Sequence, residues 1–254
     1  MAASGTTKLF IGIFLLRKGM SKVPDIFRMK MLLEQWGFHI QYIEGDREIS
    51  TYDLIASLYQ EGIPYLGTMK RTPSIKPLVE DYFDGKIPSV IPFVLKQNAG
   101  TVYKWGDIPT MLIFKTDPHT RLRDLQKQVQ MGEITREKAL EHIHIFITTL
   151  KPPRNKHQWG KWGSGLAQRF RKRWRIECGF RDMNQIPPAS HARNHGTKTL
   201  MFAFQMWGYD LWQIQRALHR RLRRVPKTWR KGPSLVRFSK RLRNQMKLSA
   251  SLET

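Results

Sequence analysis

The chain has 254 residues, of which 41% are apolar and 11% aromatic, so it can build a hydrophobic core and does not have the composition of a disordered protein. Its net charge of +24 is uneven: residues 1–150 contain 19 Lys and Arg against 16 Asp and Glu, whereas residues 151–254 contain 25 against 4. Charge of this sign and density indicates a polyanionic partner, which can be DNA, RNA or an anionic membrane surface. The single cysteine, Cys178, excludes an intramolecular disulfide framework and agrees with a reducing cytosol.

The first 71 residues alternate between predicted strands and helices. Short apolar runs predict strands over residues 8–18, 38–44 and 63–71. Helical spacing of apolar residues predicts helices over 23–37 and 50–62, each ending at a glycine. This order is typical of an α/β fold with at least partly parallel strand pairing.

The pattern changes after residue 72. Short apolar runs separated by Pro, Gly and Asn predict a mixed or mainly β segment, with a polar helical piece over 123–143. Residues 151–165 are rich in Pro, Lys and Trp and are interpreted as a linker. A long helix is predicted over 199–224, and its polar residues favour a buried helix of a soluble protein over a membrane span.

A basic stretch, residues 169–185, carries one glutamate among its arginines. Helical spacing places Phe170, Trp174 and Glu177 on one face, with Arg173 and Arg181 one turn to either side of the glutamate. One interpretation is a pair of ordinary i,i+4 ion pairs. The other is a carboxylate that holds a hard metal cation while the arginines bind phosphate.

The same stretch resembles the C-terminal motif of DDE transposases from bacterial and archaeal insertion sequences. That motif has Tyr, Arg, the catalytic Glu and Lys, and the matching residues here are Phe170, Arg173, Glu177 and Asn184. The Arg and Glu are retained, whereas Phe replaces Tyr and Asn replaces Lys. The family context is also matched by Trp174, Ile176, Phe180 and Arg181, and by the helix that follows.

The resemblance implies a set of site residues. Asp46, at the end of the strand predicted over 38–44, matches the family's second catalytic carboxylate, although turns also favour aspartate. Asp46 and Glu177 would be catalytic and would hold Mg²⁺ or Mn²⁺. DNA would be contacted by Arg171, Lys172, Arg173, Arg181, Asn184 and Phe170. Histidine-based metal binding is disfavoured, because His142, His144 and the other histidines lack cysteine partners.

The resemblance also implies the architecture. The expected fold is α/β, or α+β overall: an RNase H-like mixed sheet flanked by helices and incomplete at its first strands, with an inserted mainly β segment and a C-terminal helical region. The expected parts are a partial core over 1–71, the insertion over 72–160, helices that complete the core over 161–225, and a basic tail over 226–254. The family's first catalytic Asp has no counterpart before residue 25, so the chain is expected to be an N-terminally truncated member with impaired activity.

The expected function is therefore Mg²⁺-dependent DNA cleavage and strand transfer in transposition. Its partners would be the element's terminal repeats, target DNA and further copies of the chain, in the cytoplasm at the nucleoid and without a membrane. Two alternatives remain open. One is a non-catalytic DNA-binding remnant that could inhibit a full-length transposase, and the other is a generic basic RNA-binding protein.

Overall fold

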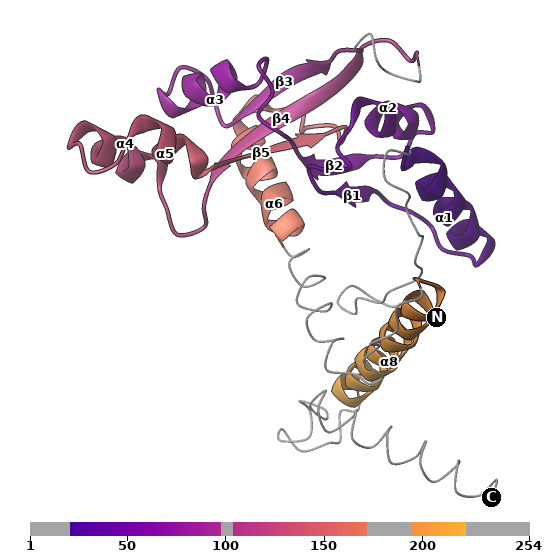
Figure 1. Ribbon diagram of the computed structural model, residues 1–254. Helices are drawn as coiled ribbons and strands as arrows, with labels where there is room; N and C mark the ends of the chain where they lie inside the picture. Colours follow the sequence, from indigo (N-terminus) through magenta and orange to yellow (C-terminus); the bar gives the residue numbers. More distant parts are fainter. Residues whose placement is uncertain (1–20, 98–103, 172–194, 222–254) are drawn as a thin grey trace, which may run out of the picture. The chain divides into compact units, whose positions relative to one another are not determined.

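The computed structural model describes residues 21–97, 104–171 and 195–221. The chain forms two compact units, one of residues Leu16–Lys172 and the other of Met1–Leu15 together with Arg173–Thr254. In the first unit a sheet is flanked by helices (Figure 1). In the second, the described part is one long helix, α8, His195–Arg221. The strand predicted over residues 8–18 and most of the basic stretch lie outside the described residues.

The first unit begins with the predicted order of elements. Helix α1, Val23–Gln35, has proline in its first turn, and helix α2, Tyr52–Gln60, starts at Thr51, whose hydroxyl accepts the amide of Leu54. Strands β1, Ile43–Gly45, and β2, Tyr65–Thr68, pair in parallel, as predicted. Strand β1 is only three residues long, so most of the strand predicted over residues 38–44 is not formed.

The remaining strands join the same sheet. Strands β3, Val90–Leu95, β4, Ile108–Thr116, and β5, Ile143–Thr148, extend it in the order β1-β2-β5-β4-β3. All pairs except β1–β2 are antiparallel. Residues 72–160, predicted as an inserted segment, thus supply three of the five strands of this sheet. The fold is mixed α+β, a five-stranded mixed sheet flanked by helices, as expected at this level of detail.

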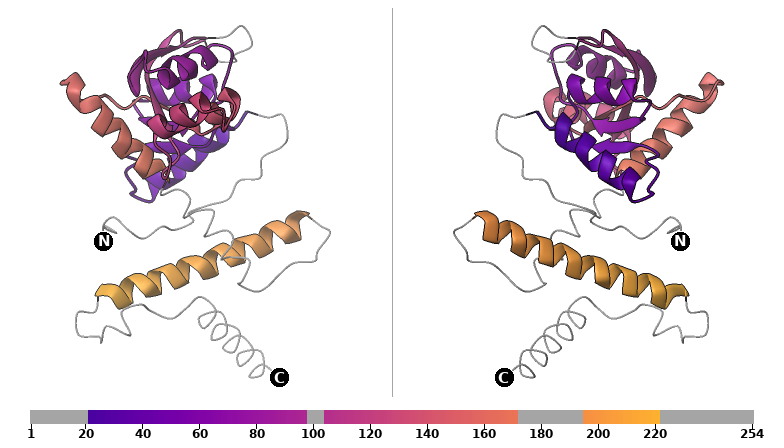
Figure 2. Two further views of the ribbon diagram at one scale, coloured as in Figure 1. Left: turned by 90° about the vertical axis from the view of Figure 1, so that its left-hand side faces the viewer. Right: turned by 90° about the vertical axis from the view of Figure 1, so that its right-hand side faces the viewer.

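Both faces of the sheet are covered, which explains why the central strands are apolar throughout. Helices α2, α3 (Lys76–Phe83), α4 (Leu122–Gln130) and α5 (Arg136–Glu141) pack on one face, and α6 (Trp159–Arg171) packs on the other (Figure 2). Successive residues of a strand therefore enter different cores. The first core takes Leu112, Phe114, Ile145 and Ile147, and the second takes Met111, Ile113 and Phe146.

The first half of helix α6 was interpreted from the sequence as part of a linker over residues 151–165, whereas its last turn falls in the predicted basic helix. Its glycines are the reason for both the error and the packing. A Cβ at Gly163 would lie 2.6 Å from Val90 Cγ2 and 3.1 Å from Ile113 Cγ2, so the missing side chain lets the helix lie directly on the sheet. Leu166 and Phe170 then enter the second core. Helix α3 was also not predicted.

Candidate functional site

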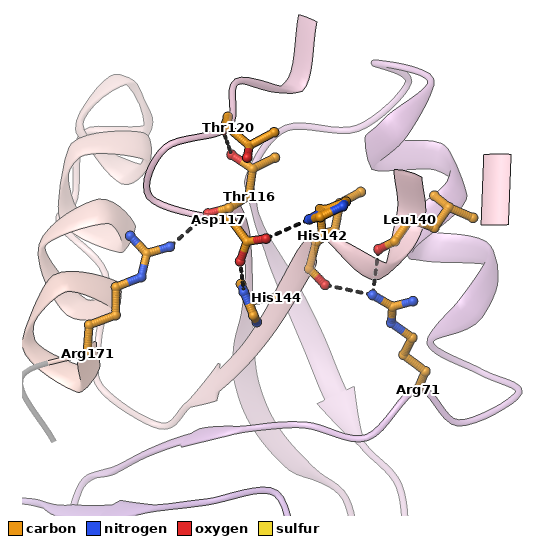
Figure 3. Close-up of polar contacts among 9 residues, drawn as sticks. Arg71, Thr116, Asp117, Thr120, Leu140, His142, His144 and Arg171 are labelled. Atoms are coloured by element: carbon orange, nitrogen blue, oxygen red, sulfur yellow. Dashed lines mark hydrogen bonds and ion pairs between the residues drawn. The ribbon is translucent and has the colours of Figure 1, made fainter. Parts of the chain in front are cut away.

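Polar and charged side chains gather where β4 ends and β5 begins, on the face that α6 covers. Lys115 and His144 are opposite one another in the β4–β5 register, two residues beyond the pair Ile113 and Phe146 of the second core. The alternation of the strands therefore places both side chains on the face where α6 ends. Figure 3 shows His144 beside the carboxylate of Asp117, the first residue after β4.

Asp117 binds two histidines at once. Its Oδ2 lies 2.7 Å from His142 Nδ1, and its Oδ1 lies 2.5 Å from His144 Nε2. The carboxylate is partly buried, which raises its pKa, but the hydrogen bonds from the two imidazoles prevail and lower that pKa below its ordinary value. Each imidazole must donate a proton to an ionised Asp117, which fixes which ring nitrogen is protonated.

Two cations lie next to this group. Lys115 is half-buried, and its pKa is lowered first by burial and then by the positive charge of Arg171. Arg171, the last residue of α6, donates from a guanidinium nitrogen to the carbonyl oxygen of Thr116 at 2.7 Å (Figure 3). Like charges held together at a partly buried position repel each other, so an anion between them would be bound favourably.

Arg71 fixes the backbone on the far side of the histidines. Its guanidinium donates to the carbonyl oxygens of Leu140, at 2.5 Å, and Ile143, at 2.9 Å. These carbonyls flank His142 at the C-terminal end of α5 (Figure 3). The positive charge of Arg71 there also interacts favourably with the helix dipole. The position of His142 is therefore set by two arginine contacts to its neighbours as well as by Asp117.

Arg169, in the C-terminal turn of α6, influences Tyr42 electrostatically. Tyr42, just before β1, has a pKa raised first by burial and then by the charge of Glu44, and the charge of Arg169 opposes this increase. Arg169 of α6 therefore lies within electrostatic range of Tyr42 and, through it, of the strand that ends at Gly45. Arg169 thus affects the residue before β1, whereas Arg171 contacts the end of β4.

Asp46, the predicted catalytic carboxylate, directly follows β1 and forms a turn. Its Oδ1 accepts the amides of Glu48, at 3.0 Å, and Ile49, at 3.2 Å, while its carbonyl oxygen accepts the Ser50 hydroxyl at 2.7 Å. This is the Asx-turn arrangement that aspartate favours at strand ends. The same turn lines a cavity of about 300 Å³ between the starts of α1 and α2, bounded by Ser21, Lys22, Val23, Glu48, Ile49, Thr51, Asp53 and Leu54.

The turn is anchored to the sheet by Tyr65, which is fully buried. The hydroxyl of Tyr65 lies 2.8 Å from that of Ser50. The ring occupies the space over Gly45 and Gly67, where any Cβ would collide with the Tyr65 hydroxyl. Two strand glycines therefore make room for one tyrosine, and the tyrosine holds the turn that carries Asp46.

The structure describes three of the eight predicted site residues. Asp46 lies in the turn after β1, and Arg171 lies beside Lys115 at the end of β4. Phe170, predicted to contact DNA, is only 7% exposed. Its ring packs edge-on against that of Phe146, with the ring centroids 5.4 Å apart, so Phe170 occupies a core position. The other five, Lys172, Arg173, Glu177, Arg181 and Asn184, lie outside the described residues.

The group around Asp117 was not predicted from the sequence. The spacing of His142 and His144 indicates one strand face, but in the structure His142 ends helix α5 and only His144 lies in β5. Among the residues that the structure describes, no three His, Cys, Asp or Glu side chains are placed to hold a metal ion. In the same part of the chain, no helix is both long and apolar enough to cross a membrane.

Comparisons with protein-family models, with curated proteins and with solved structures find no match to this chain.

Proposed function

We propose that this chain is a DNA-binding protein of transposition, related to DDE transposases, and that its basic C-terminal part contacts the phosphate backbone. The observation that carries the proposal is the charge distribution, with 25 Lys and Arg against 4 Asp and Glu in the last 104 residues. Neutralisation of phosphates by such residues supplies most non-specific affinity for nucleic acid. Among functions that require nucleic-acid binding, transposition is favoured because the motif around Glu177 resembles that of DDE transposases.

The geometry of the first unit supports this proposal in two ways. The basic stretch begins in the last turn of α6, and there Arg171 and Lys115 form a cationic site at the surface of the sheet unit. Arg169 of the same turn also acts electrostatically on Tyr42, just before β1, and β1 leads into the turn at Asp46.

Catalysis by this family needs a divalent metal ion at its carboxylates. Bound Mg²⁺ would polarise a phosphate and activate an attacking hydroxyl. In the described residues, however, Asp46 Oδ1 is engaged by two amides, and no three side chains form a metal site. These residues do not by themselves fit the ion. A non-catalytic DNA-binding remnant satisfies the same structural observations.

The test measures affinity for a fluorescent DNA duplex by anisotropy at several salt concentrations. We expect the logarithm of the binding constant to fall steeply and linearly with the logarithm of salt concentration. The variants Lys115→Gln and Arg171→Gln should each reduce that slope by about one phosphate contact. Lys127→Gln is the matched control, because Lys127 is exposed on α4, which covers the opposite face of the sheet. A salt-independent affinity would exclude a phosphate-driven interface.

Competition and cleavage separate the alternatives. A protein of transposition should prefer duplex DNA with element ends over RNA of equal length, whereas a generic RNA-binding protein should show the reverse order. If terminal-repeat DNA is nicked in the presence of Mg²⁺, Glu177→Gln should abolish the nicking while leaving the affinity for DNA unchanged. Nicking that survives this substitution would remove Glu177 from the mechanism, and binding without any nicking would favour the remnant.

A further inference from the structure

Helix α8 is apolar on two opposite sides. One side contains Met206, Tyr209 and Trp212, which are buried. The other side is a stripe of five large apolar residues, which we call the α8 stripe, each between 41% and 65% exposed: Leu200, Phe204, Trp207, Leu211 and Ile214. An apolar helix face left in water is unfavourable, and a helix that is apolar all round normally packs on more than one side. A buried helix was predicted here, whereas in the described residues only one side of α8 is buried.

The spacing of the α8 stripe is that of a coiled-coil seam. Its residues follow one another at intervals of four, three, four and three positions. This alternation repeats every seven residues and is the pattern that packs side chains of one helix into holes of another. The seam covers four turns, about 21 Å of a helix about 40 Å long. Figure 2 shows α8 as one uninterrupted helix, so nothing in its backbone prevents a partner helix from lying along it.

We infer that the α8 stripe binds the α8 stripe of a second copy of this chain, with the two helices antiparallel. The spacing is nearly symmetrical about Trp207, with two stripe residues before it and two after it. A twofold axis at Trp207 would place Leu200 opposite Ile214 of the second copy, and Phe204 opposite Leu211. One patch can thus complement itself, as a twofold interface requires.

Charge favours the antiparallel arrangement over the parallel one. The last two turns of α8 contain Arg216, Arg220 and Arg221, and the stretch that follows is also basic. Parallel helices would set these cationic ends side by side, whereas antiparallel helices separate them by the length of the seam.

The area is sufficient for a specific interface. From the exposed fractions, the five side chains present roughly 500 Å² of apolar surface per copy, since large apolar side chains offer about 150–250 Å² each when fully exposed. Two copies would then bury about 1,000 Å² from these side chains alone, which reaches the lower bound for a specific protein–protein interface. The central Trp207, with the largest exposed fraction of the five, is the expected energetic centre.

The first test measures the mass of the full chain without DNA by light scattering after size exclusion, over a range of concentrations. We expect about twice the monomer mass of 29.9 kDa. Trp207→Glu should halve the measured mass, because it places a charge in the apolar seam. Met131→Glu is the matched control, since Met131 is a highly exposed apolar residue of the first unit, and it should leave the mass unchanged. A wild-type chain that is monomeric at every concentration overturns the proposal.

The second test fixes the orientation, in a background where Cys178→Ser removes the only cysteine. The variant Leu200→Cys with Ile214→Cys should form disulfide-linked dimers under mild oxidation, and neither single variant should do so. Linkage by each single variant would show parallel helices and overturn the antiparallel arrangement. A monomer whose helix content or melting temperature falls with Trp207→Glu would show that the chain covers the stripe itself. No outcome depends on DNA binding.

Discussion

The substitution Asp46→Ala separates the structural role of Asp46 from its proposed chemical role. The variant removes the oxygen that accepts two backbone amides, those of Glu48 and Ile49. A hydrogen bond of this kind has a net contribution of about 0.5–1.5 kcal/mol, and this turn is partly exposed, so we expect a loss of about 1–2 kcal/mol. For a unit of this size the melting temperature should fall by roughly 3–6 °C. Asp46→Asn keeps the accepting oxygen and should remain within about 0.5 kcal/mol of wild type.

The assay is chemical denaturation followed by circular dichroism, with Glu48→Ala as the control from the same turn. Glu48 makes an exposed ion pair with Lys70 at 3.0 Å, which contributes little to stability. Equal stability of wild type and Asp46→Ala would refute the Asx-turn reasoning, and so would an Asn variant as unstable as the Ala variant. If DNA nicking is established, the Asn variant becomes decisive for chemistry: a folded protein that binds DNA but no longer nicks it would show that the negative charge of Asp46 is required.

Three further predictions concern the sheet unit. Gly67→Ala should destabilise the fold by about 1–3 kcal/mol, because its Cβ would lie 2.5 Å from the Tyr65 hydroxyl, and Tyr65→Phe in the same chain should recover part of the loss in a double-mutant cycle. Phe170→Ala should lower the free energy of unfolding by about 3–5 kcal/mol, because the ring is buried against Phe146. The salt dependence of DNA binding should change little. A large loss of DNA affinity with unchanged stability would contradict this core role. The pKa of Asp117 is lower in the folded protein than in the unfolded chain, where it is near 4. The ionised carboxylate therefore stabilises the fold above about pH 4, and this stabilisation is lost as the pH falls through the folded pKa. Denaturation at several pH values should therefore show wild type more stable than Asp117→Asn near pH 6, with the difference vanishing in acid; a difference that persists there would refute the linkage.

Local chemistry explains which elements could be predicted. Helix α2 was predicted from its apolar spacing, from Ser50 or Thr51 as its cap and from the glycine that follows it, and in the structure the Thr51 hydroxyl accepts the Leu54 amide. The first half of α6 has three glycines in seven residues, a composition that favours a loop in isolation. Contact with the sheet overrides that preference, because Gly163 lets the helix lie against Val90 and Ile113.

Within the candidate site, only the part formed by residues close in sequence could be predicted. The turn at Asp46 could be predicted because its residues are adjacent in sequence. The group around Asp117 could not, since Asp117 and His142 are separated by two helices and meet only through the register of β4 and β5. The register of β4 and β5 depends on which of their side chains enter each of the two cores. The sequence alone did not show that both faces of the sheet are covered, so the register could not be predicted.

The last turn of α6 connects the core to the proposed DNA contact. Phe170 points into the second core, while Arg169 and Arg171, one residue to either side, reach toward β1 and β4. Successive residues on a helix are about 100° apart, so one buried anchor necessarily directs its two neighbours to opposite sides. The predicted helical spacing puts Glu177 on the same face as Phe170, the face that meets the sheet in α6. Glu177 itself lies outside the described residues, so the effect of Glu177→Gln on DNA nicking decides between a metal ligand and an ion-pair partner.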